Sequence, residues 1–82
     1  MAEVTYFGAD WCTDCRRSKA FLNANNIEFV ENNVEDSAEL AAAAEQIAGR
    51  KNIPVIQFKD GAFLVEPSDA DLKAALAERG LI

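Results

Sequence analysis

The segment GADWCTDCRRSK, residues 8–19, holds both cysteines of the chain, Cys12 and Cys15, at a CxxC spacing. It follows EVTYF, residues 3–7, whose β-branched and aromatic residues predict a short buried strand. Over residues 13–25, apolar and basic positions separate onto two sides, which predicts a helix ending within the segment NANN. Cys12 is therefore expected near the N-terminus of this helix.

A second strand and a second helix are expected next. IEFV, residues 27–30, alternates in the manner of a strand. Asp36, with Glu39 three residues later, has the pattern of a capping box that opens a helix, and Gly49 is a typical stop. Between these ends, apolar residues recur at helical spacing and predict a buried face formed by Leu40, Ala43, Ala44 and Ile47.

The next pair of strands is predicted to be an antiparallel hairpin. IPVIQF, residues 53–58, and AFLV, residues 62–65, both have strand-like composition. They flank Asp60 and Gly61, and Asp-Gly is a strong hairpin signal.

A closing helix is expected to begin at Pro67 and Ser68, with Asp71 at the capping-box position, and to end at Gly80. Its predicted buried face consists of Leu72, Ala75 and Leu76. The order β-α-β-α-β-β-α joins two parallel strands by a crossover helix and adds a hairpin. We expect an α/β fold with a four-stranded mixed sheet flanked by three helices, with helices on both faces.

Composition limits the partners of the chain. Its 82 residues are half apolar and carry a net charge of −6, which is typical of a folded soluble domain. No apolar run reaches the roughly 18 residues of a membrane span, and the start MAEVTYF lacks a signal-peptide pattern. The acidic charge disfavours nucleic acid and anionic membranes as partners. We therefore expect a cytoplasmic monomer with one domain over residues 1–82, whose dithiol is normally kept reduced.

The position of the cysteines favours thiol–disulfide exchange, in which a thiolate is the attacking species. Unpaired N–H groups and the positive dipole end at a helix start favour this anion at Cys12. Cys15, one turn later, should point toward the core and still be near enough to attack a mixed disulfide on Cys12. Charged neighbours compete, because Arg16, Arg17 and Lys19 favour the anion whereas Asp10 and Asp14 oppose it.

Other interpretations of the cysteine pair are weaker. A structural disulfide here closes a two-residue loop in a reducing compartment and gains little. A closed zinc site needs four ligands, and the chain has two cysteines and no histidine, so metal binding requires a dimer or outside ligands. The lack of histidine also excludes a Cys–His hydrolase.

Two residues outside the cysteine pair have alternative interpretations. Pro54 either starts an edge strand in the trans form or follows a cis bond from Ile53. A cis bond beside the cysteines would turn the Ile53 backbone toward them, where an extended substrate could pair with it. Trp11 is either a lid over the cysteines or a partly buried anchor.

These segments together resemble the glutaredoxin branch of the thioredoxin superfamily over essentially the whole chain. The resemblance is carried by WCTDCRRSK after the first strand, NIPVI at the third strand, the hairpin KDG and the segment EPSDADL. The chain is most similar to the short actinobacterial glutaredoxin-like proteins called mycoredoxins, in the layout WCxxCRR.K and the ending DG…L..PS.AD.KA.L.

The resemblance implies a thioredoxin fold and a set of roles. Cys12 is then the attacking cysteine, Cys15 the resolving cysteine and Pro54 the cis-proline. The small-thiol co-substrate is implied to contact Trp11, Thr13, Ile53, Pro54, Ser68 and Asp69, with no tightly bound cofactor and no metal. Glutaredoxins reduce protein disulfides or protein mixed disulfides with glutathione, whereas mycoredoxins use mycothiol.

The chain departs from glutathione-using members at three places. It has Thr13-Asp14 where Pro-Tyr is common, Glu66-Pro67 in place of a Gly-Gly pair, and Ala9-Asp10 where a basic residue precedes the CxxC. Four acidic residues are thus expected around one cleft: Asp10, Asp14, Glu66 and Asp69. Because glutathione carries two carboxylates and the sugar and inositol of mycothiol carry none, we expect mycothiol to be favoured.

The predicted activity is that of a thiol–disulfide oxidoreductase acting on disulfide-containing or S-thiolated proteins. One alternative is a dithiol electron donor to a dedicated protein such as ribonucleotide reductase or a peroxidase, recycled by a flavin disulfide reductase. Another is a metal or iron–sulfur carrier in which two chains share a cluster. A pure protein-binding module would leave the dithiol at the helix start without a function.

Overall fold

The strand and helix order expected from the sequence is present in the computed structural model, which describes residues 3–82. Its elements are β1 (Val4–Gly8), α1 (Thr13–Ala24), β2 (Phe29–Asn33), α2 (Ala38–Ala48), β3 (Val55–Phe58), β4 (Phe63–Val65) and α3 (Asp69–Glu78). No helix among these residues is long and apolar enough to cross a membrane.

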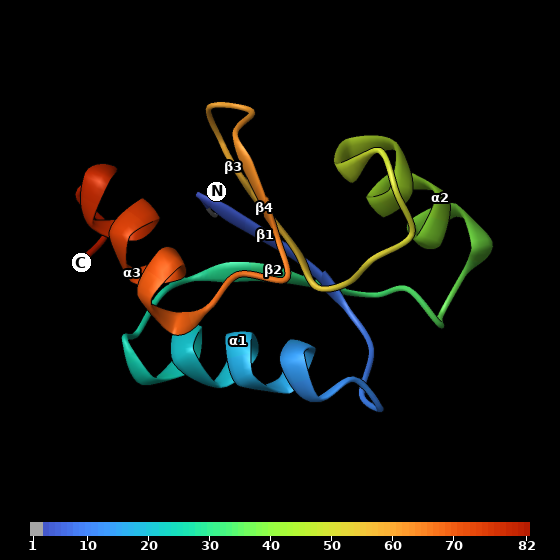
Figure 1. The fold of residues 1–82 in the computed structure, drawn as a ribbon, viewed down its shortest axis with the longest axis horizontal. Coiled ribbons are helices and arrows are strands. Elements are labelled where there is room, and N and C mark those ends of the chain that lie inside the picture. Colours follow the sequence, from blue (N-terminus) through green and yellow to red (C-terminus); the bar gives the residue numbers. More distant parts are fainter. Residues whose placement is uncertain (1–2) are drawn as a thin grey trace.

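The four strands form one mixed sheet in the order β2-β1-β3-β4. β1 pairs in parallel with β2, with Val4 opposite Phe29, and antiparallel with β3, with Val4 also opposite Phe58. β3 and β4 form the expected antiparallel hairpin. Helices α1 and α3 cover one face of the sheet and α2 covers the other (Figure 1). The predicted α/β fold class and topology are confirmed.

Alternation along the strands divides the core into two layers. The layer under α1 and α3 contains Val4, Tyr6, Cys15, Leu22, Ile56, Phe58, Leu72 and Leu76. The layer under α2 is smaller and is built on Phe7, Ala44 and Val55. The predicted inner face of α2 packs against this second layer. One of the two cysteines is therefore part of the larger apolar layer.

The boundaries of β2 differ from the prediction of residues 27–30. Ile27 lies in the turn that follows α1, because its N–H donates to the Leu22 carbonyl at 2.9 Å while Asn26 adopts a positive φ of 57°. Pairing with β1 starts only at Phe29 and continues to Asn33, opposite Gly8. The extended pairing carries polar residues into the strand, which the alternation pattern does not reveal.

The start of α2 also differs from the prediction. Ser37 is the N-cap, with its hydroxyl accepting from the Leu40 N–H at 3.1 Å. Asp36 instead lies in the preceding turn, where its N–H donates to the Asn33 carbonyl. The predicted stop is confirmed, because Gly49 ends α2 at a φ of 76°.

The last two elements agree closely with the sequence patterns. In the hairpin, the Gly61 N–H donates to the Phe58 carbonyl at 2.9 Å and Gly61 has a φ of 92°, which glycine adopts without strain. At the start of α3, the Ser68 hydroxyl accepts from the Asp71 N–H at 3.1 Å, as the capping pattern predicts. Leu72 and Leu76 of α3 are fully buried.

Candidate active site

Cys12 is the N-cap of α1, directly after the loop that leaves β1. Its sulfur accepts a hydrogen bond from the Cys15 N–H at 3.2 Å, and its side chain is half-buried. A backbone N–H at a helix start can stabilise negative charge that develops on the atom it meets during thiol–disulfide exchange. Cys12 is therefore both reachable from solvent and placed for nucleophilic attack.

Cys15 has a very different environment one helical turn later. It is completely buried in the layer under α1 and α3, and the Tyr6 hydroxyl donates to its carbonyl at 3.3 Å. Burial, and then the hydrogen bond with the Cys12 side chain, raise the pKa of the Cys15 thiol to about 12. Cys15 therefore remains protonated at neutral pH, and the pair divides into one accessible and one buried sulfur.

The loop before β3 forms the second side of the site. The Ile53–Pro54 peptide bond is cis, which confirms one of the two alternatives for Pro54. The Ile53 carbonyl oxygen lies 3.9 Å from the Cys12 sulfur, and Pro54 is buried. The CxxC and this loop are thus neighbours although 41 residues separate Cys12 from Ile53.

Trp11 is exposed beside the cysteines. It is 67% exposed, which excludes the partly buried anchor. Its indole Nε1–H donates to the Glu35 carboxylate at 2.7 Å, so the ring is tied to the loop between β2 and α2. The sequence offered no signal for this contact between residues 24 positions apart.

A glutaredoxin family model matches residues 4–63. The chain belongs to the glutaredoxin family. It is 35% identical over 81 residues to two Mycobacterium tuberculosis proteins named as glutaredoxins, a match that covers 94% of this chain and 93% of each relative. The resemblance inferred from the sequence is thereby confirmed.

Solved structures agree on the fold. A glutaredoxin from Archaeoglobus fulgidus superposes with a TM-score of 0.81 at 23% identity, over 90% of this chain and 85% of that one. A glutaredoxin from Brucella melitensis gives 0.67 at 29% identity, over 98% and 83% of the two chains. Glutaredoxins are thiol–disulfide oxidoreductases that act on disulfide-containing or thiolated proteins through a small thiol of the glutathione type.

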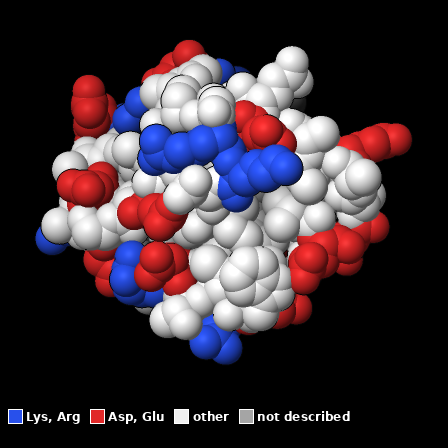
Figure 2. Space-filling view, turned by 45° about the vertical axis from the view of Figure 1, so that its right-hand side comes forward, with Lys and Arg blue, Asp and Glu red and all other residues white. Residues whose placement is uncertain are grey.

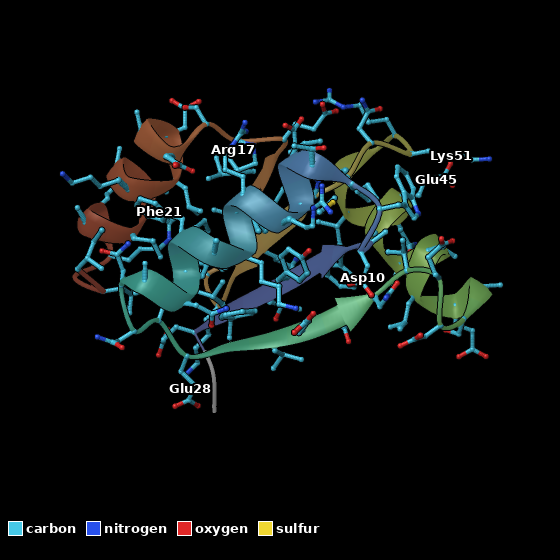
Figure 3. The ribbon with its side chains drawn as sticks, turned by 90° about the horizontal axis from the view of Figure 1, so that it is seen from below. Asp10, Arg17, Phe21, Glu28, Glu45 and Lys51 are labelled. Atoms are coloured by element: carbon cyan, nitrogen blue, oxygen red, sulfur yellow. The ribbon has the colours of Figure 1, made fainter. Side chains whose placement is uncertain are left out.

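In this glutaredoxin the start of α3 is tied to α1 by Arg17. The guanidinium donates to the Pro67 carbonyl at 3.2 Å and forms ion pairs with Asp14 at 3.2 Å and Asp69 at 3.8 Å. Figure 3 shows Arg17 between α1 and the chain that enters α3. Two of the four acidic residues expected around the cleft therefore share one cation, which weakens the repulsion inferred from the sequence.

The other charged residues that the sequence places around the site have separate surroundings. Glu66 accepts a hydrogen bond from the Asn52 side chain, and Asp10 is exposed. Lys19 turns away, because its ammonium pairs with Glu31 at 2.6 Å. Asp14 and Arg17 are three residues apart in α1, a spacing that brings helix side chains together, whereas the contact with α3 depends on packing of the helices.

The residues implied for small-thiol binding lie on three segments of the described chain. Trp11 and Thr13 flank Cys12, Ile53 and Pro54 form the loop opposite its sulfur, and Ser68 and Asp69 start α3. Across residues 3–82, no group of three or more metal-ligating side chains is brought together.

The buried Cys15 predicts a loss of stability at alkaline pH. The folded protein holds this thiol protonated up to about pH 12, whereas the unfolded chain releases the proton near pH 8.5. The stabilisation of the fold by the protonated Cys15 thiol is therefore complete below about pH 8.5 and is lost as the pH rises toward 12. We expect the free energy of unfolding to fall by up to about 1.4 kcal/mol per pH unit from this group.

Urea unfolding of the reduced protein between pH 8 and 11 measures this slope, with Cys15→Ser as the control. Burial also raises the pKa of Tyr6, so the control should begin to lose stability only near pH 10. Equal profiles for the two proteins would contradict the assignment to Cys15.

Proposed function

We propose that this glutaredoxin reduces protein mixed disulfides and protein disulfides with mycothiol as its small-thiol co-substrate. The observation that carries the proposal is the division of the cysteine pair: Cys12 is accessible and accepts the Cys15 N–H, whereas Cys15 is completely buried. We further propose that residues 1–82 act as a single-domain monomer in the cytoplasm.

The monothiol route needs only Cys12. Its thiolate attacks the small-thiol sulfur of a protein mixed disulfide, a Cys12–small-thiol disulfide forms, and the client leaves as a thiolate that takes a proton. A second small-thiol molecule, as its thiolate, attacks the sulfur bound to Cys12. The small-thiol disulfide then departs, and Cys12 returns as a thiolate.

Cys15 supports a second, slower route. Its thiolate can displace a client from Cys12 and leave a Cys12–Cys15 disulfide, which two small-thiol molecules reduce again while they become a disulfide. Burial and the raised pKa keep Cys15 protonated, so this displacement competes poorly near neutral pH. The mixed disulfide on Cys12 then persists long enough for an outside thiol to reach it.

The preference for mycothiol rests on three features. The chain resembles mycoredoxins, it lacks the glycine pair before α3, and it carries Asp10 before the CxxC and Glu66 before α3. Arg17 offsets Asp14 and Asp69, so we expect glutathione to be disfavoured rather than excluded. We assign the contacts with the small-thiol co-substrate to Trp11, Thr13, Ile53, Pro54, Ser68 and Asp69.

Measurement of intact mass tests which small thiol is the co-substrate. The Cys15→Ser protein is mixed with equal amounts of mycothiol disulfide and glutathione disulfide, and adduct formation on Cys12 is followed with time. We expect the mycothiol adduct to form faster, by about tenfold, a ratio that corresponds to about 1.4 kcal/mol. Equal rates, or a faster glutathione adduct, would refute the preference and leave the oxidoreductase activity standing.

The dithiol electron donor is the second candidate function. It is favoured by the contact of the Cys15 backbone with the Cys12 sulfur, which keeps the two residues within one turn. In that role Cys15 is indispensable, and the partner is a protein such as ribonucleotide reductase or a peroxidase. If neither small thiol forms an adduct, and the Cys15→Ser protein incubated with an extract of its host traps a protein on Cys12 instead, this candidate replaces the first.

A further inference from the structure

The hydroxyl of Tyr6 lies next to the buried cysteine, in a layer of the core that is largely apolar. Tyr6 is 3% exposed and belongs, with Cys15, to the layer under α1 and α3. Its hydroxyl donates to the Cys15 carbonyl oxygen at 3.3 Å. Burying a hydroxyl costs free energy unless it is hydrogen-bonded, so the contact with Cys15 is what makes a tyrosine acceptable at this position.

The Cys15 carbonyl does not depend on this hydroxyl. Cys15 lies inside α1, where the ordinary donor to its carbonyl is the N–H four residues later, that of Lys19. The distance of 3.3 Å is also long for a hydrogen bond between a hydroxyl and an oxygen. Because a hydroxyl proton rotates about its C–O bond, the Tyr6 hydroxyl can turn to another acceptor close by.

The side chain of Cys15 provides such an acceptor. The Tyr6 hydroxyl oxygen and the Cys15 Cβ lie 2.2 and 3.1 Å from the point that a Cβ on Gly8 would occupy, so the two groups are neighbours. Burial raises the pKa of the Cys15 thiol, whereas a hydrogen bond with the Tyr6 side chain acts in the opposite direction. Burial raises the pKa of Tyr6 as well, so its hydroxyl keeps its proton and is a donor at neutral pH.

The tyrosine ring is held in this position from the other side. The rings of Tyr6 and Phe29 meet edge to face, with centroids 5.9 Å apart and planes at 65°. Tyr6 also lies on a strand that is paired on both sides, with β2 and with β3. The hydroxyl is therefore in place before Cys15 reacts, and a donor that is already oriented needs no rearrangement during the reaction.

We propose that the Tyr6 hydroxyl donates a hydrogen bond to the Cys15 sulfur while Cys15 displaces a client from Cys12. This inference rests on the proposed oxidoreductase function and adds a residue to its resolving step. In that step the Cys15 thiol releases its proton to water, and the thiolate attacks the Cys12 sulfur. The Cys12–Cys15 bond forms, the bond between Cys12 and the client sulfur breaks, and the client leaves as a thiolate that takes up a proton. A donor beside the buried sulfur stabilises the negative charge that this sulfur carries before it attacks.

Dithiodipyridine measures the two cysteines in one reaction. When it is added to the reduced protein in equal amount, the Cys12 thiolate attacks it, a Cys12–thiopyridine disulfide forms and one thiopyridone is released. The Cys15 thiolate then displaces a second thiopyridone, so the dithiol loses the two electrons that the reagent gains. Absorbance follows both releases. Figure 2 shows acidic side chains around a largely uncharged area of the surface, so an uncharged reagent avoids their repulsion.

Tyr6→Phe should slow the second release about tenfold, because the hydrogen bond to an anionic sulfur is lost. The first release should stay within about twofold, since Cys12 keeps its contact with the Cys15 N–H. Ser18→Ala is the matched control. Ser18 is completely buried one turn after Cys15, and within residues 3–82 its hydroxyl oxygen has no hydrogen-bond partner. Loss of this hydroxyl should change neither release, and Cys15→Ser should show the first release alone.

A second variant separates hydrogen bonding from packing. Tyr6 is the only tyrosine of the chain, so protein produced with fluorotyrosine is altered at this ring alone. Fluorine makes the phenol a stronger hydrogen-bond donor and nearly preserves its shape. We expect the second release from this protein to be at least as fast as from the unaltered one.

The contrary results distinguish the inference from the proposed function. A second release that is unchanged in Tyr6→Phe, two releases slowed by the same factor, or an equal slowing in Ser18→Ala would overturn the role of Tyr6. Fluorotyrosine protein as slow as Tyr6→Phe would show that packing around the ring governs the step, which also overturns it. Absence of the first release would instead refute the proposed function, because Cys12 then attacks no disulfide.

Discussion

The Cys12→Ser protein should lose roughly a thousandfold or more of its rate of mixed-disulfide reduction, because a serine hydroxyl cannot replace the attacking thiolate. Serine can still cap α1, since its hydroxyl can accept the N–H that now meets the sulfur. Stability should therefore change little. Reduction of an S-thiolated test protein, followed by mass, measures the activity, and urea unfolding measures the stability.

The Cys15→Ser protein is the matched comparison. On the monothiol route it should retain activity within about threefold of the unaltered protein toward a mixed disulfide, because Cys15 takes no part in either exchange. Its activity toward an intramolecular protein disulfide should fall far more, since there the resolving thiol releases the client. Loss of both activities in Cys15→Ser would favour the dithiol electron donor over the proposed enzyme that uses a small thiol.

Among the glycines of this chain, Gly8 should be the least tolerant of substitution by alanine. A Cβ at this position would lie 2.2 Å from the Tyr6 hydroxyl oxygen and 3.1 Å from the Cys15 Cβ. Both neighbours are buried, so neither the tyrosine ring nor the first turn of α1 can move freely. We expect a loss of about 3 kcal/mol in the free energy of unfolding, the upper part of the range for overpacked cores.

Gly80→Ala is the control for this substitution. Gly80 has a φ of 72° and open space around its Cβ position, so its replacement costs only the backbone strain of about 1 kcal/mol. Gly8→Ala should therefore cost more although its backbone is in an ordinary extended strand. Equal losses in urea unfolding would show that Tyr6 gives way at little cost.

Local patterns were sufficient to predict the elements and their order. The strand at the N-terminus, the Asp60-Gly61 turn and the Ser68 cap each depend on residues close in sequence, and each has the expected geometry. The errors came where neighbouring patterns competed: Ser37 rather than Asp36 caps α2, and Ile27 lies in the turn after α1 instead of opening β2.

In the candidate site, too, features that depend on residues close in sequence could be predicted and long-range contacts could not. The placement of Cys12 at a helix start and of Cys15 toward the core follows from helical periodicity, and both could be predicted. Contacts between distant side chains could not, because they depend on how whole elements pack. The hydrogen bond from Trp11 to Glu35 and the link from Arg17 to α3 are of this kind.

The hydrogen bond from the Cys15 N–H to the Cys12 sulfur also affects the redox potential of the cysteine pair. The structure contains this contact in the dithiol form, and the contact stabilises that form relative to a Cys12–Cys15 disulfide. In a thermodynamic cycle, any extra folding stability of the dithiol form reappears as a less negative midpoint potential, with about 30 mV for each 1.4 kcal/mol. A single helix-capping contact thus influences whether the cysteine pair tends to donate electrons to a partner or to accept them.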